Sequence, residues 1–209
     1  MARHTGPVCR LCRREGQKLF LKGERCHGPK CAIERKNYPP GEHGNSRRGR
    51  RRPSDYALQL REKQKLRAIY GLLERPFRSY VARALKSPGV TGFTLLSLLE
   101  RRLDSVLRRA GFASSQNQAR QLVRHRHVTV NGRVCDIPSR LLREGDLIEI
   151  REGSKDSPHI AASIGRGYQV PGWLSVDSSN RAITVSRMPE PEDIQVDVDE
   201  QQVVEFYSR

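Results

Sequence analysis

The sequence predicts an α+β fold: a cysteine-bearing N-terminal arm, a small helical domain, and a module of two helices packed on a small antiparallel sheet. Three observations predict it. Four cysteines fall in pairs within the first 31 residues, apolar residues recur at helical spacing between residues 55 and 110, and a Val-Thr-Val-Asn-Gly run at 128–132 marks a β-hairpin. We place the domain limits at residues 1–45, 46–96 joined by 187–209, 97–160, and 161–186, the last a linker with short strands that extend the module.

Positive charge is concentrated in the N-terminal half. The 209 residues carry 39 Lys+Arg against 23 Asp+Glu, a formal net charge of +16. Residues 1–87 hold 23 of the basic and 7 of the acidic residues, so the whole excess lies there. A segment this basic is typical of a protein that binds nucleic acid or an anionic membrane surface.

The sequence argues against a membrane. No run approaches the ~20 apolar residues of a membrane span, the mean hydropathy is −0.69, and the N-terminus lacks the apolar stretch of a secretory signal. We therefore expect a cytoplasmic protein with no membrane partner. In that compartment clustered cysteines more often bind metal than form structural disulfides.

The cysteine pairs are spaced as metal ligands. Cys9 and Cys12 form one pair, Cys26 and Cys31 the other, and thirteen residues separate them. Two such knuckles can bring four thiolates to one tetrahedral centre, for which zinc is the usual ion. An iron–sulfur cluster and two unrelated reduced pairs remain alternatives. Cys135, alone in a predicted strand, reads as a small core residue.

Residues 37–53 are rich in proline, glycine and arginine and cannot form a core. The run Arg47, Arg48, Arg50, Arg51 and Arg52 repels itself until an anion neutralises it. We expect this strip to order on phosphates, the alternative being a solvated linker.

Two helices follow the strip. Ser54 and Asp55 form a start signal for a helix that Gly71 can end. Pro76 opens a second helix, in which Phe77, Tyr80, Val81, Ala84 and Leu85 form one apolar stripe.

The module begins at Thr94, the predicted cap of a helix with an apolar stripe from Leu95 to Ala110. Ser115 and Gln118 match a capping box for the next helix, with Arg120 on its polar side. Asn131-Gly132 is a strong hairpin signal, and residues 147–150 form a third strand. Arginines on the outer side of both helices favour RNA over DNA, because no major-groove recognition helix is evident. The alternative is an ordinary solvated face.

The C-terminal segment is less definite. A strand is expected near residues 183–185, and residues 203–206 fit a strand or a helix equally well. Trp173 reads as a core anchor. The acidic run at 190–200 is either a solvated loop or a patch for a basic partner.

Several stretches carry a family resemblance. RRLDSVLRRAGFA, QARQLVRHRHVTVNG and REGDLIEI resemble the small RNA-binding fold named after ribosomal small-subunit protein four. Outside them, CRLCRREG, YPPGEHG, RRPSDYALQLREKQKLRAIYG and EQQVVEFYSR make nearly the whole chain similar to the bacterial S-four family, in its branch that bears zinc knuckles. Arg126 stands where that family usually has glycine, which makes a positive φ there less expected.

The resemblance implies a structural component of the small ribosomal subunit that binds 16S ribosomal RNA early and nucleates assembly of the subunit body. It also implies contact with ribosomal proteins five and twelve, a part in translational accuracy, and repression of its own messenger RNA. The RNA-facing residues of the module would be Arg102, Arg109, Gln118, Arg120, Arg124, His125 and His127, and Arg47 to Arg52 would match a basic strip near the messenger entry.

Further cations of the N-terminal half are expected to bind RNA. They are Arg3, Arg10, Arg13, Arg14, Lys22, Arg25, Lys30, Arg35, Lys36, His43, Arg61, Lys63, Lys65 and Arg67.

Two other classes of protein share some of these features. RNA-modifying enzymes carry the same small fold as an appendage, but residues 152–209 offer no catalytic constellation and no small-molecule site. A zinc-dependent DNA-binding regulator is compatible with the cysteines alone. We therefore predict a protein without enzymatic activity.

Overall fold

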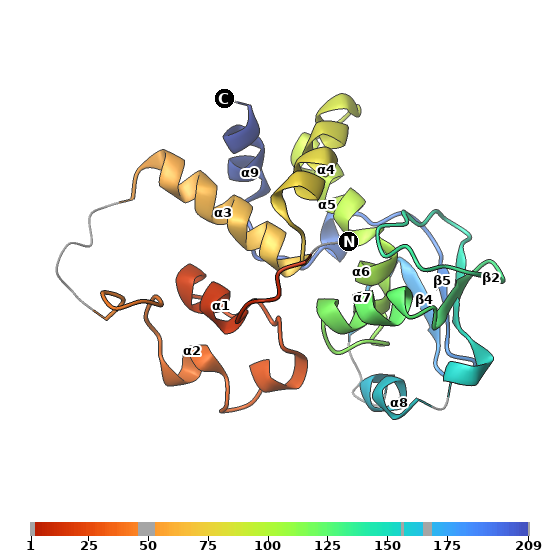
Figure 1. The fold of residues 1–209 in the computed structure, drawn as a ribbon. Helices are drawn as coiled ribbons and strands as arrows, with labels where there is room; N and C mark the ends of the chain where they lie inside the picture. Colours follow the sequence, from red (N-terminus) through yellow and green to blue (C-terminus); the bar gives the residue numbers. More distant parts are fainter. Residues whose placement is uncertain (1–2, 46–52, 156, 165–168, 209) are drawn as a thin grey trace. The chain divides into compact units, whose positions relative to one another are not determined.

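The computed structural model describes residues 3–45, 53–155, 157–164 and 169–208. Two units emerge, Met1–Gly92 with Asp197–Arg209, and Phe93–Val196. The mixture of helices and antiparallel sheet predicted from the sequence is confirmed (Figure 1). No helix in the described part of the chain combines the length and the apolar composition of a membrane span.

The first unit is built from helices that lie far apart in the sequence. The C-terminal helix α9 packs along α3 (Figure 1), and α1 contacts both α2 and α3. The elements are α1 (Cys9–Glu15), η1 (Gly23–Cys26), α2 (Ala32–Arg35), α3 (Asp55–Ile69), α4 (Glu74–Lys86) and α9 (Glu200–Tyr207). Of the two alternatives for residues 203–206, the helix is the one formed.

Helix α3 has the ends that the sequence predicts. The Ser54 hydroxyl accepts a hydrogen bond from the Ala57 amide at the N-terminus. At the C-terminus Gly71 has a φ of +61°, and the Leu72 amide donates to the Arg67 carbonyl. A residue with positive φ just beyond a helix, closed by this bond, satisfies carbonyls that the helix itself leaves unpaired.

Helix α4 buries one stripe of side chains. Phe77, Tyr80, Val81 and Ala84 are buried, as their spacing predicts, and all come from one side of the helix. Leu85 is 48% exposed, so its assignment to the stripe was wrong. It lies at the edge of the buried arc, where the helix turns toward solvent.

The second unit pairs helices with a five-stranded antiparallel sheet of order β2-β1-β3-β5-β4. Its helical elements are α5 (Thr91–Glu100), which begins at the unit boundary, α6 (Leu103–Arg109), α7 (Gln116–Arg124), η2 (Glu152–Ser154), α8 (Pro158–Ile164) and η3 (Pro191–Asp193). Its strands are β1 (Val128–Val130), β2 (Arg133–Val134), β3 (Leu147–Ile150), β4 (Leu174–Asp177) and β5 (Ala182–Val185).

A single apolar core joins the helices of this unit to its sheet. Side chains of α6 and α7 meet those of β1, β3 and β5, with Ile160 from α8. Trp173 is 1% exposed within this core, which confirms its role as an anchor. Cys135 is also buried there, as expected for a small core residue.

The helix predicted to run from Thr94 to Ala110 is two helices, and this prediction was wrong. α5 already starts at Thr91, and the chain breaks at Arg102, whose backbone is extended. Residues 138–142 cause the break: the Leu142 amide donates to the Arg101 carbonyl, and the Leu103 amide donates to the Arg140 carbonyl. These long-range bonds take the place of helical bonds at the break.

The turn between α7 and β1 also departs from expectation. Arg126 has a φ of +62° despite its side chain. Its amide donates to the Val123 carbonyl, and the amide of His127 donates to the Leu122 carbonyl. This pair of bonds is a Schellman cap, which requires positive φ at the residue where glycine is usual. The cap compensates for the strain that the side chain brings.

Candidate nucleic-acid interface

The arm places three of its four cysteines in the interior. Cys12, Cys26 and Cys31 are buried, and Cys9 is half-buried. The Lys22 amide donates a hydrogen bond to the Cys26 Sγ at 3.3 Å, and the Leu19 amide acts in the same way on Cys12. Amides that point at sulfur stabilise thiolates, the form in which cysteine binds metal.

The four thiols are neighbours but are not drawn to one centre. Among the described residues, no group of three or more His, Cys, Asp or Glu side chains forms a ready-made metal site. Burial raises the pKa of Cys12 and Cys26, and in each case a backbone amide opposes it. Negative charge on Cys9, Cys26 and Cys31 would raise the pKa of Cys12 further, so all three lie within electrostatic range of it. Free thiols in such a buried group have the chemistry that a zinc ion requires.

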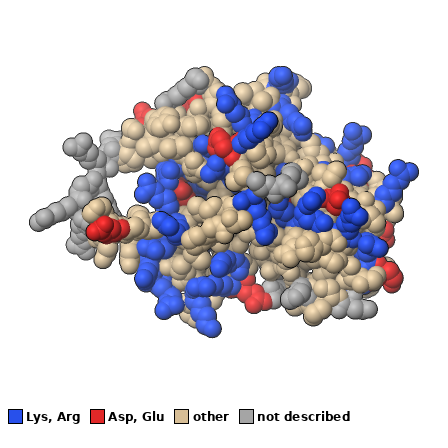
Figure 2. Space-filling view, in the orientation of Figure 1, with Lys and Arg blue, Asp and Glu red and all other residues tan. Residues whose placement is uncertain are grey.

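The cations of the arm point outward. In the space-filling view, Lys and Arg side chains stand over the part of the molecule where Figure 1 has α1 and α2 (Figure 2). Exposed residues from the predicted set are Arg3, Arg10, Arg14, Lys22, Arg25, Lys30, Arg35, Lys36 and His43. This surface, called the arm surface below, is available to phosphates. The strip Arg47 to Arg52 lies outside the described residues.

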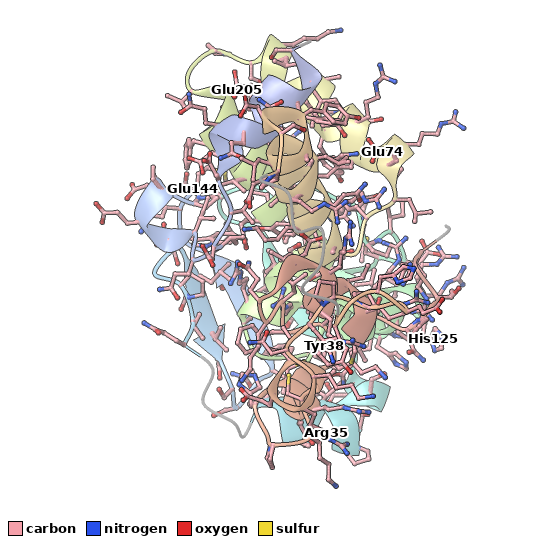
Figure 3. The ribbon with its side chains drawn as sticks, turned by 90° about the vertical axis from the view of Figure 1, so that its left-hand side faces the viewer. Arg35, Tyr38, Glu74, His125, Glu144 and Glu205 are labelled. Atoms are coloured by element: carbon pink, nitrogen blue, oxygen red, sulfur yellow. The ribbon has the colours of Figure 1, made fainter. Side chains whose placement is uncertain are left out.

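Arg13 has a different role from its neighbours. Its Nε donates to the Tyr38 carbonyl at 3.0 Å, its Nη2 donates to the Pro39 carbonyl at 3.2 Å, and the guanidinium lies 4.7 Å from the centre of the Tyr38 ring. Tyr38 and Arg35 are both labelled in the arm in Figure 3. Arg13 therefore fixes the Tyr-Pro-Pro loop to α1 rather than facing solvent.

The predicted cations of α3 are engaged inside the first unit. Lys63 and Lys65 are buried and pair with Glu74 and Glu62, at 2.9 and 2.8 Å. Arg67 also reaches Glu74, at 3.1 Å, and Arg61 reaches Glu15 at 3.3 Å. Sequence periodicity could not separate these structural cations from RNA-facing ones, because the partners of Lys63, Arg67 and Arg61 come from other helices; only Lys65 pairs within α3, with Glu62.

Glu74 is the centre of a small polar cluster between α3, α4 and α9. Besides Lys63 and Arg67 it accepts a 2.6 Å hydrogen bond from the Tyr207 hydroxyl. Burial alone would raise the pKa of Glu74, but the bonds from Tyr207 and Lys63 outweigh it and lower that pKa. Burial and the bond to Glu74 raise the pKa of Tyr207. Glu74 and Glu205 both lie beside α3 (Figure 3).

Two arginines of the predicted RNA-facing module are interior residues. Arg102 is 1% and Arg120 is 7% exposed, so their placement on the outer face was wrong. Both guanidiniums bind the fully buried Asp104: Arg102 donates two bonds, of 2.9 and 2.6 Å, and Arg120 stands at 3.6 Å. Burial raises the pKa of Asp104, and the two cations oppose this. The three charges form a cross-link between α6 and α7.

Two further predicted residues are also held internally. Arg109 donates to the carboxylate of Glu100 at 2.9 Å. The side-chain oxygen of Gln118 accepts hydrogen bonds from the backbone amide and the hydroxyl of Ser114, at 2.7 and 2.6 Å, and the backbone amide of Gln118 donates to the Ser115 hydroxyl. The capping box is therefore formed in part, with Ser114 rather than Ser115 as the partner of the Gln118 side chain.

The outward-facing cations of the module gather at the C-terminal end of α7. Arg124, His125 and Arg126 are exposed, and His127 is half-buried with its Nδ1 2.8 Å from the Ser154 hydroxyl. The two imidazole rings lie 6.0 Å apart. The Schellman cap thus gathers four residues able to contact phosphates or bases at one corner.

Three arginines of this unit stand outside the predicted RNA-binding set, although two of them, Arg101 and Arg126, are among the arginines predicted for the module's basic face. Arg126 is exposed and only weakly paired, at 3.5 Å from Asp136. Arg101 lies close to Arg143, and burial together with that second cation lowers the pKa of Arg101. Two neighbouring guanidiniums favour an anion between them. Arg101 and Arg143 stand in the segments Arg101–Asp104 and Arg143–Asp146, which are distant in the sequence. Only the fold brings these two segments together.

Two family models match successive parts of the chain. Residues 3–100 match the family model "Ribosomal protein S4/S9 N-terminal domain", and residues 101–148 match "S4 domain". The chain is 56% identical over 211 aligned residues to the small ribosomal subunit protein uS4 of Thermus thermophilus, covering all of both chains. It belongs to the uS4 family of ribosomal proteins.

Other uS4 proteins agree as well over their whole length. Those of Desulfitobacterium hafniense and Thermodesulfovibrio yellowstonii are both 54% identical, again with 100% of each chain covered. The uS4 family is one of structural ribosomal proteins, so membership also settles that this chain is not an enzyme. The S4-domain match spans α6, α7 and the hairpin, the elements that carry the exposed corner of the module.

Proposed function

We propose that this chain is a structural component of the small ribosomal subunit that binds 16S ribosomal RNA and nucleates the subunit body. The observation that carries the proposal is the full-length match to uS4 proteins, which are named for the small subunit. The arm surface and the corner at Arg124–His127 supply the cations for it. Phosphates bound there would release condensed counterions, which is the main source of affinity for RNA.

The wider role follows from the same assignment. We infer a cytoplasmic protein that works within the ribosome, contacts ribosomal proteins five and twelve, contributes to translational accuracy, and represses its own messenger RNA. The strip Arg47 to Arg52 is assigned to the messenger entry. The acidic residues between Glu190 and Glu200 fit a basic protein neighbour, since Glu190 and Glu192 are exposed.

Reconstitution tests the assignment directly. The full chain, added to 16S ribosomal RNA alone, is expected to bind one multi-helix junction and protect its backbone from hydroxyl-radical cleavage. It is also expected to sediment with small subunits rather than large ones. Diffuse protection across the RNA, or equal recovery with both subunits, would overturn the assignment.

We further propose that the arm holds one zinc ion through Cys9, Cys12, Cys26 and Cys31, which places the chain in the zinc-knuckle branch of the family. The support is chemical: three of these thiols are buried and free, and backbone amides donate to two of them. Zinc would supply folding free energy to a segment with little apolar core. An iron–sulfur cluster would use the same four ligands.

Chelation is expected to loosen the arm and spare the rest. With a strong chelator, proteases should cut within residues 3–45 at least tenfold faster, because the bound metal provides much of the local stability. The helices beyond Ser54 should be cut at an unchanged rate. Mass spectrometry of the cleavage products measures both.

Two variants distinguish loss of the metal from a general loss of folded structure. Cys12→Ser should lower the zinc content to near zero, whereas Cys135→Ala, which removes a buried thiol from the second unit, should leave it unchanged. Elemental analysis distinguishes zinc from iron. Wild-type protein that binds neither metal would refute this part of the proposal.

A further inference from the structure

A further basic surface lies on α4, outside every residue assigned above to RNA. From residue 75 to residue 99 the sequence has no acidic residue, and its four cations all fall in α4. They are Arg75, Arg78, Arg83 and Lys86, and all four are exposed. We call this set the α4 strip.

Helical geometry puts the strip on one face. At 100° per residue, the four cations fall within an arc of about 140°, opposite the buried stripe of Phe77, Tyr80, Val81 and Ala84. Ser79 and Ala82, both exposed and small, occupy the middle of the arc. Lys and Arg side chains stand over the region where Figure 1 has α4 (Figure 2).

The strip has no acid to neutralise it in the described part of the chain. Glu74, the one acidic residue of α4, is turned to Lys63, Arg67 and Tyr207 and makes no ion pair with the strip. Arg83 contacts only the face of Tyr80, at 5.9 Å. Arg75 and Arg78, like Arg83 and Lys86, are three residues apart on the helix and repel each other. Such repulsion is relieved when an anion binds.

We propose that the α4 strip binds the sugar–phosphate backbone of an RNA helix, as a contact separate from the arm surface and from the corner of the second unit. The proposal rests on the proposed function and extends it to residues that the sequence did not single out. The strip is about 16 Å long, at 1.5 Å per residue, and therefore faces several phosphates. Guanidiniums, three of its four cations, match phosphate oxygens in pairs.

The composition of the strip favours RNA over a protein partner. Protein interfaces are usually centred on aromatic or aliphatic anchors. The centre of this face holds Ser79 and Ala82 between cations, and the one large exposed apolar side chain, Leu85, lies at its edge. Because only small side chains stand at the centre of this face, the sugar–phosphate backbone of RNA can approach the helix closely.

A matched pair of substitutions at Ser79 tests the proposal in the full chain. Ser79→Glu puts a negative charge in the middle of the strip, while Ser79→Gln adds similar bulk without charge. Both lose only the hydroxyl bond to the Arg75 carbonyl. Binding to 16S ribosomal RNA at low salt is expected to be about three- to tenfold weaker for Ser79→Glu than for Ser79→Gln, whose affinity should match wild type.

A triple variant, Arg78→Gln with Arg83→Gln and Lys86→Gln, tests the phosphate contacts themselves. Each lost contact should reduce the slope of log K against log salt by about 0.7 to 0.9, so we expect a reduction of roughly two for the triple variant. Thermal unfolding should be nearly unchanged, because the substituted side chains are exposed.

The outcomes separate this proposal from the assignment to the small subunit. If wild type binds 16S RNA steeply with salt and both sets of variants bind alike, the α4 strip does not bind RNA while the main assignment stands. Unchanged RNA binding combined with failure to enter reconstituted subunits would point to an acidic protein on the strip, and would likewise overturn the proposal. If the wild-type chain does not bind 16S RNA, both the α4-strip proposal and the assignment to the small subunit are refuted.

Discussion

Asp104→Ala is expected to destabilise the second unit by about 3 to 5 kcal/mol, the largest effect of any single substitution considered for this chain. Asp104 is fully buried and faces two guanidiniums, one of which is 1% exposed. Without the carboxylate, Arg102 and Arg120 would remain buried and would lose the anion that both guanidiniums bind. The desolvation of both charges and their mutual repulsion would then destabilise the folded state.

The effect can be assigned to the second unit because Trp173 is the only tryptophan and lies in that unit's core. Urea unfolding followed by its fluorescence therefore reports this unit, whereas circular dichroism reports both. Glu144→Ala removes an exposed carboxylate from the same unit and should change stability by less than about 0.5 kcal/mol. A loss near 1 kcal/mol for Asp104→Ala would show that water reaches the two arginines, contrary to their burial.

Local signals in the sequence were sufficient for the elements that are bounded by short-range chemistry. Ser54 and Gly71 define both ends of α3, because a side-chain oxygen and a residue with positive φ each act within a few residues. Asn131 and Gly132 both have positive φ and turn β1 into β2, as the hairpin signal predicts. Such features require nothing from the rest of the chain.

The charged residues were harder to predict, because their roles depend on partners distant in sequence. A polar position on a helix was taken as solvent-facing, yet Arg120 of α7 meets Asp104 of α6, and Lys63 of α3 meets Glu74 of α4. The break before α6 comes from bonds to residues 138–142. Arg126 adopts positive φ because the cap bonds of α7 outweigh a preference measured for single residues. For the ion pairs and the helix break, tertiary contacts override a local rule; at Arg126 one local feature, the helix cap, overrides another.

Because these cations are buried, the predicted RNA contacts that remain exposed lie on two surfaces, the arm surface and the corner at Arg124–His127. The net charge of the chain resides in residues 1–87, and the arm surface carries nine exposed cationic or histidine side chains from the predicted set. The second unit offers a smaller corner at Arg124–His127. The arm surface should therefore supply most of the salt-dependent affinity, and the corner should fix the position on the RNA.

Neutralising the arm surface is accordingly expected to have the largest effect on RNA binding. In a variant with five exposed cations changed to glutamine, the slope of log K against log salt should fall by roughly 3.5 to 4.5, at about 0.7 to 0.9 per phosphate contact. Its affinity at moderate salt should fall by about a hundredfold or more. The five are Arg10, Arg14, Lys22, Arg25 and Lys30. All are exposed, so the variant should keep its fold, which circular dichroism and zinc content can check.

The comparison variant changes Arg124 and His125 to glutamine. The slope of log K against log salt should fall by at most about one, since only one of the two side chains is an arginine. Hydroxyl-radical protection should instead spread beyond the junction, because contacts that position the protein are lost while most phosphate contacts remain. Filter binding from about 0.05 to 0.3 M salt gives the slopes, and equal slopes for the two variants would mean that the arm surface does not dominate the electrostatics.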